Sequence, residues 1–288
     1  MDRLYPNHTP AANPALIEPL SAPLAFSHKV SSGNASYTYH RHDGCEVFLF
    51  LSGHIRFYVE QTCYEPVPGS LIILNHNEMH RVESIDESPY ERIVVNVKRS
   101  YLEHLSTPEH SLADCFYNRA RGTENLRVLS PEAVKEFMQL FQDLSRSREP
   151  GCYGASILQN SYAALLFLWV GEQFRTSGLP VRNTMPPYVS GVMRYLADHP
   201  EEPLSLDLLS AEFHVSATYL SAQFKRHTGL TLRSYQLDLK VGRAKELLES
   251  GATVTEACYG SGFRDYANFL RSFKHITGTS PGKYAKQA

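Results

Sequence analysis

An eleven-residue motif occurs twice in the C-terminal part of this chain, and it restricts the possible folds more than any other feature. The segment YLSAQFKRHTG at residues 219–229 returns as NFLRSFKHITG at residues 268–278, an offset of 49 positions. A short apolar helical pattern, a tight turn and a capping residue precede each copy, Ser216 before the first and Asp265 before the second. A helix, a turn of a few residues and a second helix form a helix-turn-helix unit, so the repeat predicts two such units.

The charge distribution favours nucleic acid as the partner of this part of the chain. The net charge of the 288 residues is -2, but the segment from His214 onward carries 11 Lys and Arg against 5 Asp and Glu, or +6. A connecting helix is expected over residues 235–249, with Leu237, Val241, Ala244 and Leu248 on its buried side. Two units joined by such a helix can enter successive turns of the major groove, about 34 Å apart. The alternative is an ordinary helical bundle built from a duplicated helix pair.

Residues 188–288, with GFRDYANFLRSFKHITGTSPGKY at their end, resemble the AraC/XylS family of bacterial transcription regulators. The resemblance implies a seven-helix DNA-binding domain whose recognition helices span residues 217–227 and 266–276. It implies DNA-contacting side chains on both helices: Ala217, Thr218, Ser221, Ala222 and Lys225, then Tyr266, Ala267, Leu270, Arg271 and Lys274. Apolar side chains at core spacing, namely Leu220, Phe224, Phe263, Phe269 and Phe273, are assigned to the interior, as is Cys258.

The small residues on the first recognition helix depart from the family pattern. Many relatives carry Arg at the position of Ala222, and with Ala217, Thr218 and Ser221 beside it this helix has no long side chain for bidentate guanine contacts. We therefore expect Arg271 and its neighbours on the second helix to contribute more sequence discrimination than the first helix.

The N-terminal half changes from a proline-rich arm to short strands. Five prolines between Pro6 and Pro23 exclude helix there and suit an extended arm. From Tyr37 to Val97 short apolar runs alternate with Gly, Pro and Asn, which predicts an antiparallel barrel or sandwich. The run VFLFLSGHIRFYVE, broken at Ser52-Gly53, predicts a hairpin.

His40 and His42, followed by Glu46, Gly53 and then His80, match the spacing of a cupin barrel. This pattern also resembles the effector-binding domain commonly found in front of AraC-type DNA-binding domains. Residues 40 and 42 of a strand point the same way, so these groups either form an effector pocket, bind a metal, or serve as structural groups paired with Asp43 or Glu46. The effector pocket is our preferred interpretation, with Tyr37, Tyr39, Phe48 and Tyr58 as candidate walls for a sugar ring.

A helical pair is expected after the strands. Ser130 and Pro131 suit the start of a helix whose apolar stripe runs from Val134 to Leu144. A second helix, from about Gly154 to Arg175, is apolar on more than one face, which indicates deep burial or a subunit interface.

The predicted architecture is α+β and multidomain. It comprises an arm and first strands (1–35), a cupin-like effector-binding antiparallel β-barrel (36–129), a helical dimerisation segment (130–176), a linker (177–187) and an all-α DNA-binding domain with two helix-turn-helix units (188–288). We expect a sequence-specific transcription regulator that responds to a sugar or related metabolite. Because members of the resembling family usually activate transcription, we expect an activator. Its expected partners are promoter DNA, the effector, RNA polymerase and a second copy of the chain.

Other classes of protein receive no support from the sequence. The longest wholly apolar stretch, Ala163–Val170, is far short of the ~20 residues of a membrane span. No secretory signal is visible, and the 5 scattered cysteines do not form a disulfide framework, which fits the cytoplasm. No nucleophile elbow or phosphate-binding loop is present, so we expect neither an enzyme nor a resident cofactor. The alternative is a metal-binding cupin, a metal sensor or an enzyme, fused to a DNA-binding domain.

Overall fold

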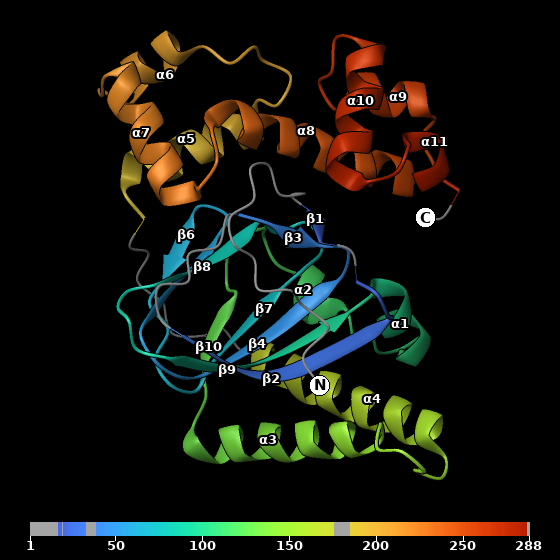
Figure 1. Cartoon of the computed structure of the whole chain (residues 1–288). Helices are drawn as coiled ribbons and strands as arrows, with labels where there is room; N and C mark the ends of the chain where they lie inside the picture. The colour runs from blue at the N-terminus through green and yellow to red at the C-terminus, as the bar shows by residue number, and fades with distance from the viewer. Residues whose placement is uncertain (1–16, 19, 33–38, 176–184, 287–288) are drawn as a thin grey trace.

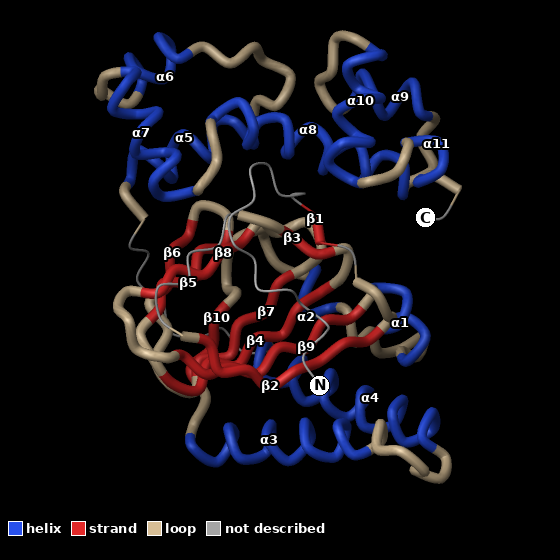
Figure 2. The backbone as a smooth tube through the Cα atoms, viewed as in Figure 1, coloured by secondary structure: helices blue, strands red, loops and turns tan. Residues whose placement is uncertain are grey.

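The computed structural model describes residues 17–18, 20–32, 39–175 and 185–286. Strands dominate the first part of the chain and helices form the rest (Figures 1 and 2). The strands are β1 (Ile17–Glu18), β2 (Leu24–Ser31), β3 (Arg41–His42), β4 (Cys45–Ser52), β5 (Ile55–Val59), β6 (Thr62–Tyr64), β7 (Ser70–Leu74), β8 (His80–Ser84), β9 (Tyr90–Val97) and β10 (Leu126–Val128). Most of the expected arm and of the expected linker, residues 177–187, lies outside the described residues.

Two antiparallel sheets form the N-terminal domain. One has the order β10-β7-β4-β9-β2 and the other the order β6-β5-β8, while β1 and β3 pair in parallel at the rim. Apolar side chains from both sheets, including Phe48, Phe57 and Tyr90, meet in a core between them. The sheets are separate hydrogen-bonded ladders, so the expected barrel is present as a two-sheet, cupin-like form that is not closed.

The hairpin expected at Ser52-Gly53 is wrong. β4 pairs with β7 and β9, whereas β5 pairs with β6 and β8, so the turn carries the chain from one sheet to the other. Gly53 has a φ of 109°, and a Cβ there would lie 2.5 Å from the Cβ of Tyr90. Apolar runs on both sides of a Ser-Gly turn are common to a hairpin and to a sheet-switching corner, so the sequence pattern does not separate the two.

Two long helices cover the outer face of the five-stranded sheet (Figure 1). They are α3 (Pro131–Arg146), which begins where Ser130 accepts a hydrogen bond from the Ala133 amide, and α4 (Ala155–Phe174). Their buried side chains, Phe137 and Phe167 among them, pack with the outward face of β4, β7 and β9 in a second core. The smaller helices α1 (Arg99–Leu105) and α2 (Asp114–Tyr117) lie between β9 and β10 in sequence. The two helices lie where the sequence predicts them, and Ser130 caps the first as expected.

Seven helices make up the C-terminal domain within residues 185–286. They are α5 (Pro187–Asp198), α6 (Leu206–Glu212), α7 (Ala217–Thr228), α8 (Leu232–Glu249), α9 (Val254–Gly260), α10 (Tyr266–Thr277) and α11 (Pro281–Tyr284). Helix α8 runs between two helical clusters, one with α5 to α7 and one with α9 to α11 (Figure 1). No helix of the described ranges is long and apolar enough to cross a membrane.

Candidate functional sites: a histidine cluster and two recognition helices

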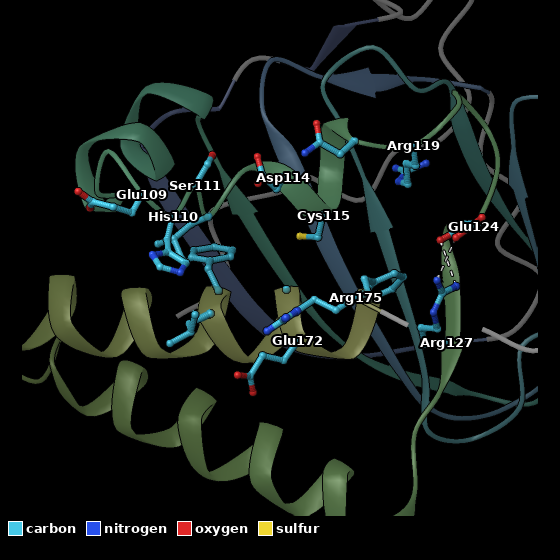
Figure 3. Close-up of a pocket in the computed structure, with 16 residues that line it drawn as sticks. Glu109, His110, Ser111, Asp114, Cys115, Arg119, Glu124, Arg127, Glu172 and Arg175 are labelled. Carbon is cyan, nitrogen blue, oxygen red and sulfur yellow. Dashed lines mark hydrogen bonds and ion pairs between the residues drawn. The ribbon is translucent and has the colours of Figure 1, made fainter. Parts of the chain in front are cut away.

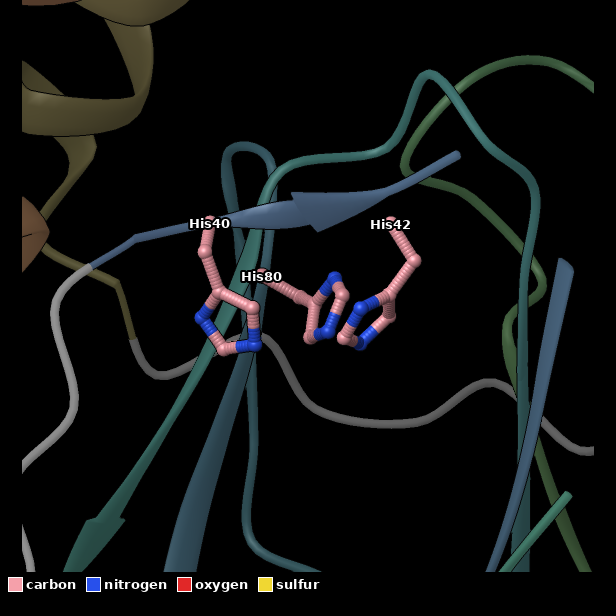
Figure 4. Close-up of side chains that lie close together, drawn as sticks. All are labelled: His40, His42 and His80. Atoms are coloured by element: carbon pink, nitrogen blue, oxygen red, sulfur yellow. The ribbon is translucent and has the colours of Figure 1, made fainter. Parts of the chain in front are cut away.

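Three histidines, His40, His42 and His80, converge at the rim of the two-sheet domain (Figure 4). Glu46 pairs with His42, and we refer to these four residues as the histidine cluster. The His40 and His80 ring centroids lie 4.5 Å apart, and the His42 ring is 5.2 Å from each. One ring nitrogen of each histidine lies within 4.8 Å of the others. The His42 Nε2 atom is 2.8 Å from Glu46 Oε2. The four residues selected from sequence spacing therefore do meet in space.

Burial sets the protonation of this cluster. His42, His80 and Glu46 are buried, and the Phe57 ring is stacked 6.0 Å from the His80 ring. Burial, with the neighbouring His40 as the second cause, lowers the pKa of His80 to about 3. Burial alone would raise the pKa of Glu46, but the adjacent His42 lowers it to about 2. At neutral pH the cluster thus offers a neutral imidazole and a carboxylate, groups that bind a divalent transition metal or hydrogen-bond a polar ligand.

The strand segments that carry the cluster also contact the C-terminal domain. Tyr39, Met79 and two neighbours share an apolar cluster with side chains of α5, α7 and α8. The Arg41 Nη2 atom is 2.9 Å from Asp238 Oδ1 on α8, and Arg81 Nε donates a hydrogen bond to the His227 carbonyl at 2.9 Å. Tyr39, expected to line the ligand pocket, lies in this interdomain cluster. Tyr37 falls outside the described residues.

The C-terminal domain contains both expected helix-turn-helix units. Ser216 accepts a hydrogen bond from the Tyr219 amide at the start of α7, and Asp265 accepts one from the Asn268 amide at the start of α10. Both helices end at a glycine with φ 75° and ψ -9°, Gly229 and Gly278. The same cap at the same place in each copy shows that the repeated sequence folds into a repeated structure.

The expected DNA-contacting residues lie on the outer faces of these helices. On α7, Thr218, Ala222 and Lys225 are exposed, and on α10, Tyr266, Ala267, Arg271 and Lys274 are exposed. Ala217, Ser221 and Leu270 are half-buried beside them. The five side chains assigned to the interior are all buried: Leu220, Phe224, Phe263, Phe269 and Phe273. Cys258 is buried with Ala257 and Phe269 and behaves as a small apolar side chain.

Two family models match this chain. The model described as "AraC-like ligand binding domain" covers residues 30–155, and the one described as "Helix-turn-helix domain" covers residues 209–287. The chain belongs to the AraC family of transcription regulators. Its AraC-type ligand-binding domain holds the histidine cluster, and its helix-turn-helix domain holds both recognition helices.

Curated relatives of this AraC-family chain are similar over most of their length. The Msm operon regulatory protein of Streptococcus mutans serotype c is 22% identical over 247 residues, which is 85% of each chain. The HTH-type transcriptional activator RhaR of Escherichia coli strain K12 is 21% identical over 246 residues, 85% of this chain and 86% of the relative.

Solved structures also align with the chain. Fatty acid-bound ToxT from Vibrio cholerae is 13% identical, covering 91% of this chain and 94% of its own, with a TM-score of 0.39. The C-terminal domain of AraT from Geobacillus stearothermophilus is 24% identical, covering 37% of this chain and 89% of its own, with a TM-score of 0.35.

A cavity of about 400 Å³ opens on another side of the AraC-type ligand-binding domain (Figure 3). Its lining includes Phe167, Glu172 and Phe174 of α4, and Arg175 at the end of that helix. Much of its charge is internally paired, since Arg119 binds Glu78 and Arg127 binds Glu124. No sequence pattern indicates this cavity, because its walls come from α2 and the segments around it, from α4 and from β10, which share no motif or spacing.

Proposed function

We propose that this chain is a one-component transcription regulator controlled by an effector that binds at the histidine cluster. One observation carries the proposal: the segments that supply His40, His42 and His80 to the cluster also supply Arg41 and Arg81 to the contact with the DNA-binding domain. An effector at this rim acts on the domain interface without a relay through the rest of the fold. From the family resemblance we also expect the chain to activate transcription by acting on RNA polymerase.

The effector class that the resemblance implies is a sugar or related metabolite. Imidazoles and a carboxylate suit its hydroxyl groups, because together they supply hydrogen-bond donors and acceptors in one place. Native mass spectrometry of the purified protein against a metabolite library tests this, with His42→Ala as the variant and His28→Ala as the matched control. His28 lies outside the cluster and pairs with Glu91 at the surface. A retained metabolite that is lost only from His42→Ala supports the proposal, and equal binding by both variants refutes the site.

A metal-responsive regulator is the second candidate, and a specific observation favours it. Three imidazole nitrogens within 4.8 Å of one another, with a carboxylate paired to one of them, form a donor set for iron, nickel, zinc or cobalt. Elemental analysis and Co²⁺ absorption spectroscopy separate the candidates. Stoichiometric metal in wild type and in His28→Ala, but not in His42→Ala, selects the metal. Absence of Co²⁺ binding in wild type rejects this candidate.

Helix α4 is the proposed dimerisation surface, with a second copy of the chain as its partner. Ile157, Leu165 and Leu168 follow helical spacing on one side of the helix and are 71%, 51% and 49% exposed. These apolar side chains lie opposite the ones that α4 buries against the sheet, such as Leu166 and Val170. A row of exposed apolar side chains on an otherwise buried helix is typical of a subunit interface.

A further inference from the structure

Residues 39–42 and 79–81 present side chains to two different sites. Successive residues of an extended segment point to opposite faces, so His40 and His42 enter the histidine cluster while Arg41 points the other way. His40 and His80 exchange backbone hydrogen bonds of 3.0 and 2.8 Å, which tie the two segments together. A displacement of the backbone at His40 or His42 therefore also moves Arg41.

The ion pair between Arg41 and Asp238, which we term the latch, is fully buried. The side chains of both residues are 0% exposed. Only one hydrogen bond joins them, and Arg41 Nε, Arg41 Nη1 and Asp238 Oδ2 have no partner among the described residues. A buried charge pair is favourable only when its geometry is good and its remaining polar atoms are satisfied. The latch fails the second condition, so the balance between its closed and separated states is close.

The latch also tolerates little movement. Gly242 of α8 lies over the guanidinium of Arg41, and a Cβ at this glycine would be 2.9 Å from Arg41 Nη1. Asp238 and Gly242 are one helical turn apart on α8. Asp238 pairs with the Arg41 guanidinium and Gly242 packs against it, so both contacts come from the same face of the helix. Helix α8 connects the two helix-turn-helix units (Figure 1), so its contact with Arg41 helps to hold both units against the ligand-binding domain, together with the Tyr235–Glu60 and Asn77–Glu246 hydrogen bonds.

We propose that the latch couples the histidine cluster to the DNA-binding domain, and that occupancy of the cluster releases α8. Drawing ring nitrogens that now lie up to 4.8 Å apart onto one ion, at about 2.0–2.1 Å from each, displaces residues 40–42. Coupling of this kind is reciprocal, so release of the latch strengthens binding at the cluster. The inference rests on the proposed function, since it takes the cluster as the effector site.

Hydrogen exchange of the full-length chain, with Co²⁺ as the probe, tests the coupling. Asp238→Asn removes the charge with little change in shape. Glu246→Gln makes the same charge change at an exposed position of the same helix, where the amide oxygen of Gln can still accept the hydrogen bond that Asn77 donates to Glu246. We expect residues 236–245 and 39–42 to exchange about tenfold faster in Asp238→Asn, and wild-type rates in Glu246→Gln. We expect Co²⁺ to produce the same acceleration in wild type and no further acceleration in Asp238→Asn, although Co²⁺ binds to both.

Each failure has a separate meaning. If Co²⁺ binds wild type and exchange in α8 does not change, the latch proposal is overturned while the site stands. If Asp238→Asn exchanges like Glu246→Gln, the latch does not hold α8 and the proposal is again overturned. If Co²⁺ does not bind wild type, the metal form of the proposed function fails and the coupling falls with it. The paired variant Arg41→Met/Asp238→Leu replaces both charges with apolar side chains and leaves no unpaired buried charge that could unfold the protein. We expect its domains to stay in contact and Co²⁺ to bind without faster hydrogen exchange in α8. Faster exchange in this variant on Co²⁺ binding also overturns the proposal.

Discussion

The two recognition helices differ in their capacity to read DNA, and Arg271→Ala tests that difference. Arg271 is exposed on α10, where a guanidinium can make a bidentate contact to guanine. The equivalent surface of α7 offers Thr218 and Ala222, which are too short for such a contact. We therefore expect removal of Arg271 to cost more sequence discrimination than removal of either of these α7 side chains.

The expected magnitude follows from one bidentate contact. Such a contact contributes about 1–3 kcal/mol of discrimination, or roughly 5- to 150-fold in affinity for the preferred site. Affinity for unrelated DNA is expected to change only a few-fold, because it depends on phosphate contacts. Lys274→Ala is the matched comparison on the same helix. It removes an exposed charge one turn later, and we expect it to weaken binding to all sequences alike and to reduce the log–log salt slope by about 0.9.

The measurement has two stages. Selection from random DNA gives the preferred site, and fluorescence anisotropy with every single-base variant of that site, at one fixed salt concentration, gives the discrimination of each protein. Thermal unfolding of each variant confirms that the fold is intact, as expected for exposed positions. If Arg271→Ala keeps the wild-type base preferences, or if strict preference lies only under α7, the reasoning is refuted.

Three further predictions concern assembly, pH and stability. Leu165→Asp on α4 is expected to convert a dimer to a monomer in sedimentation velocity without lowering the melting temperature, because Leu165 is 51% exposed; a persistent dimer would exclude this helix. Burial, with Arg41 as the second cause, lowers the pKa of Lys245 from 10.5 to about 8, so its contribution to stability is fully present above pH 10.5 and is lost as the pH falls through 8. Lys245→Met is therefore expected to remove a rise in unfolding free energy of at most about 3 kcal/mol between pH 8 and 10.5, and an unchanged slope in urea titrations would contradict the assignment. Ser216→Ala and Asp265→Ala each remove a helix cap and are expected to cost about 1 kcal/mol in the same titrations; no loss in either variant would show that the caps are replaced by water.

The features that the sequence predicts well are local or repeated. At Ser130, Ser216 and Asp265 the helix cap is a hydrogen bond between the side chain and the amide three residues later. The residue type at one position therefore decides whether the cap forms. The histidine cluster was found because His40 and His42 share a strand face. His80 joined it only through the spacing of a known barrel type, since no local rule places β8 beside residue 40.

The features that sequence reasoning missed depend on pairs far apart in the chain. Arg41 and Asp238 are separated by 197 residues, and nothing in the pattern around either residue indicates a partner. The sequence places Tyr39 in the ligand pocket because aromatic residues on strands suit both a core and a sugar site. Its burial against α5 and α8 depends on the docking of two domains, which no periodicity within one domain encodes.

The composition of the domain interface bears on how such a regulator works. An interface that only had to hold the two domains together would be expected to bury apolar side chains alone, because an apolar replacement of a buried ion pair is often neutral or stabilising. This chain instead places a half-satisfied ion pair beside the apolar cluster of Tyr39 and Met79, and an interdomain hydrogen bond from Tyr235 to the buried Glu60. Each separated charge can be hydrated by water, so the polar contacts lower the cost of opening relative to an apolar interface of the same size. A contact that must close in one state and open in another requires a small difference in free energy between the two, and this composition provides it.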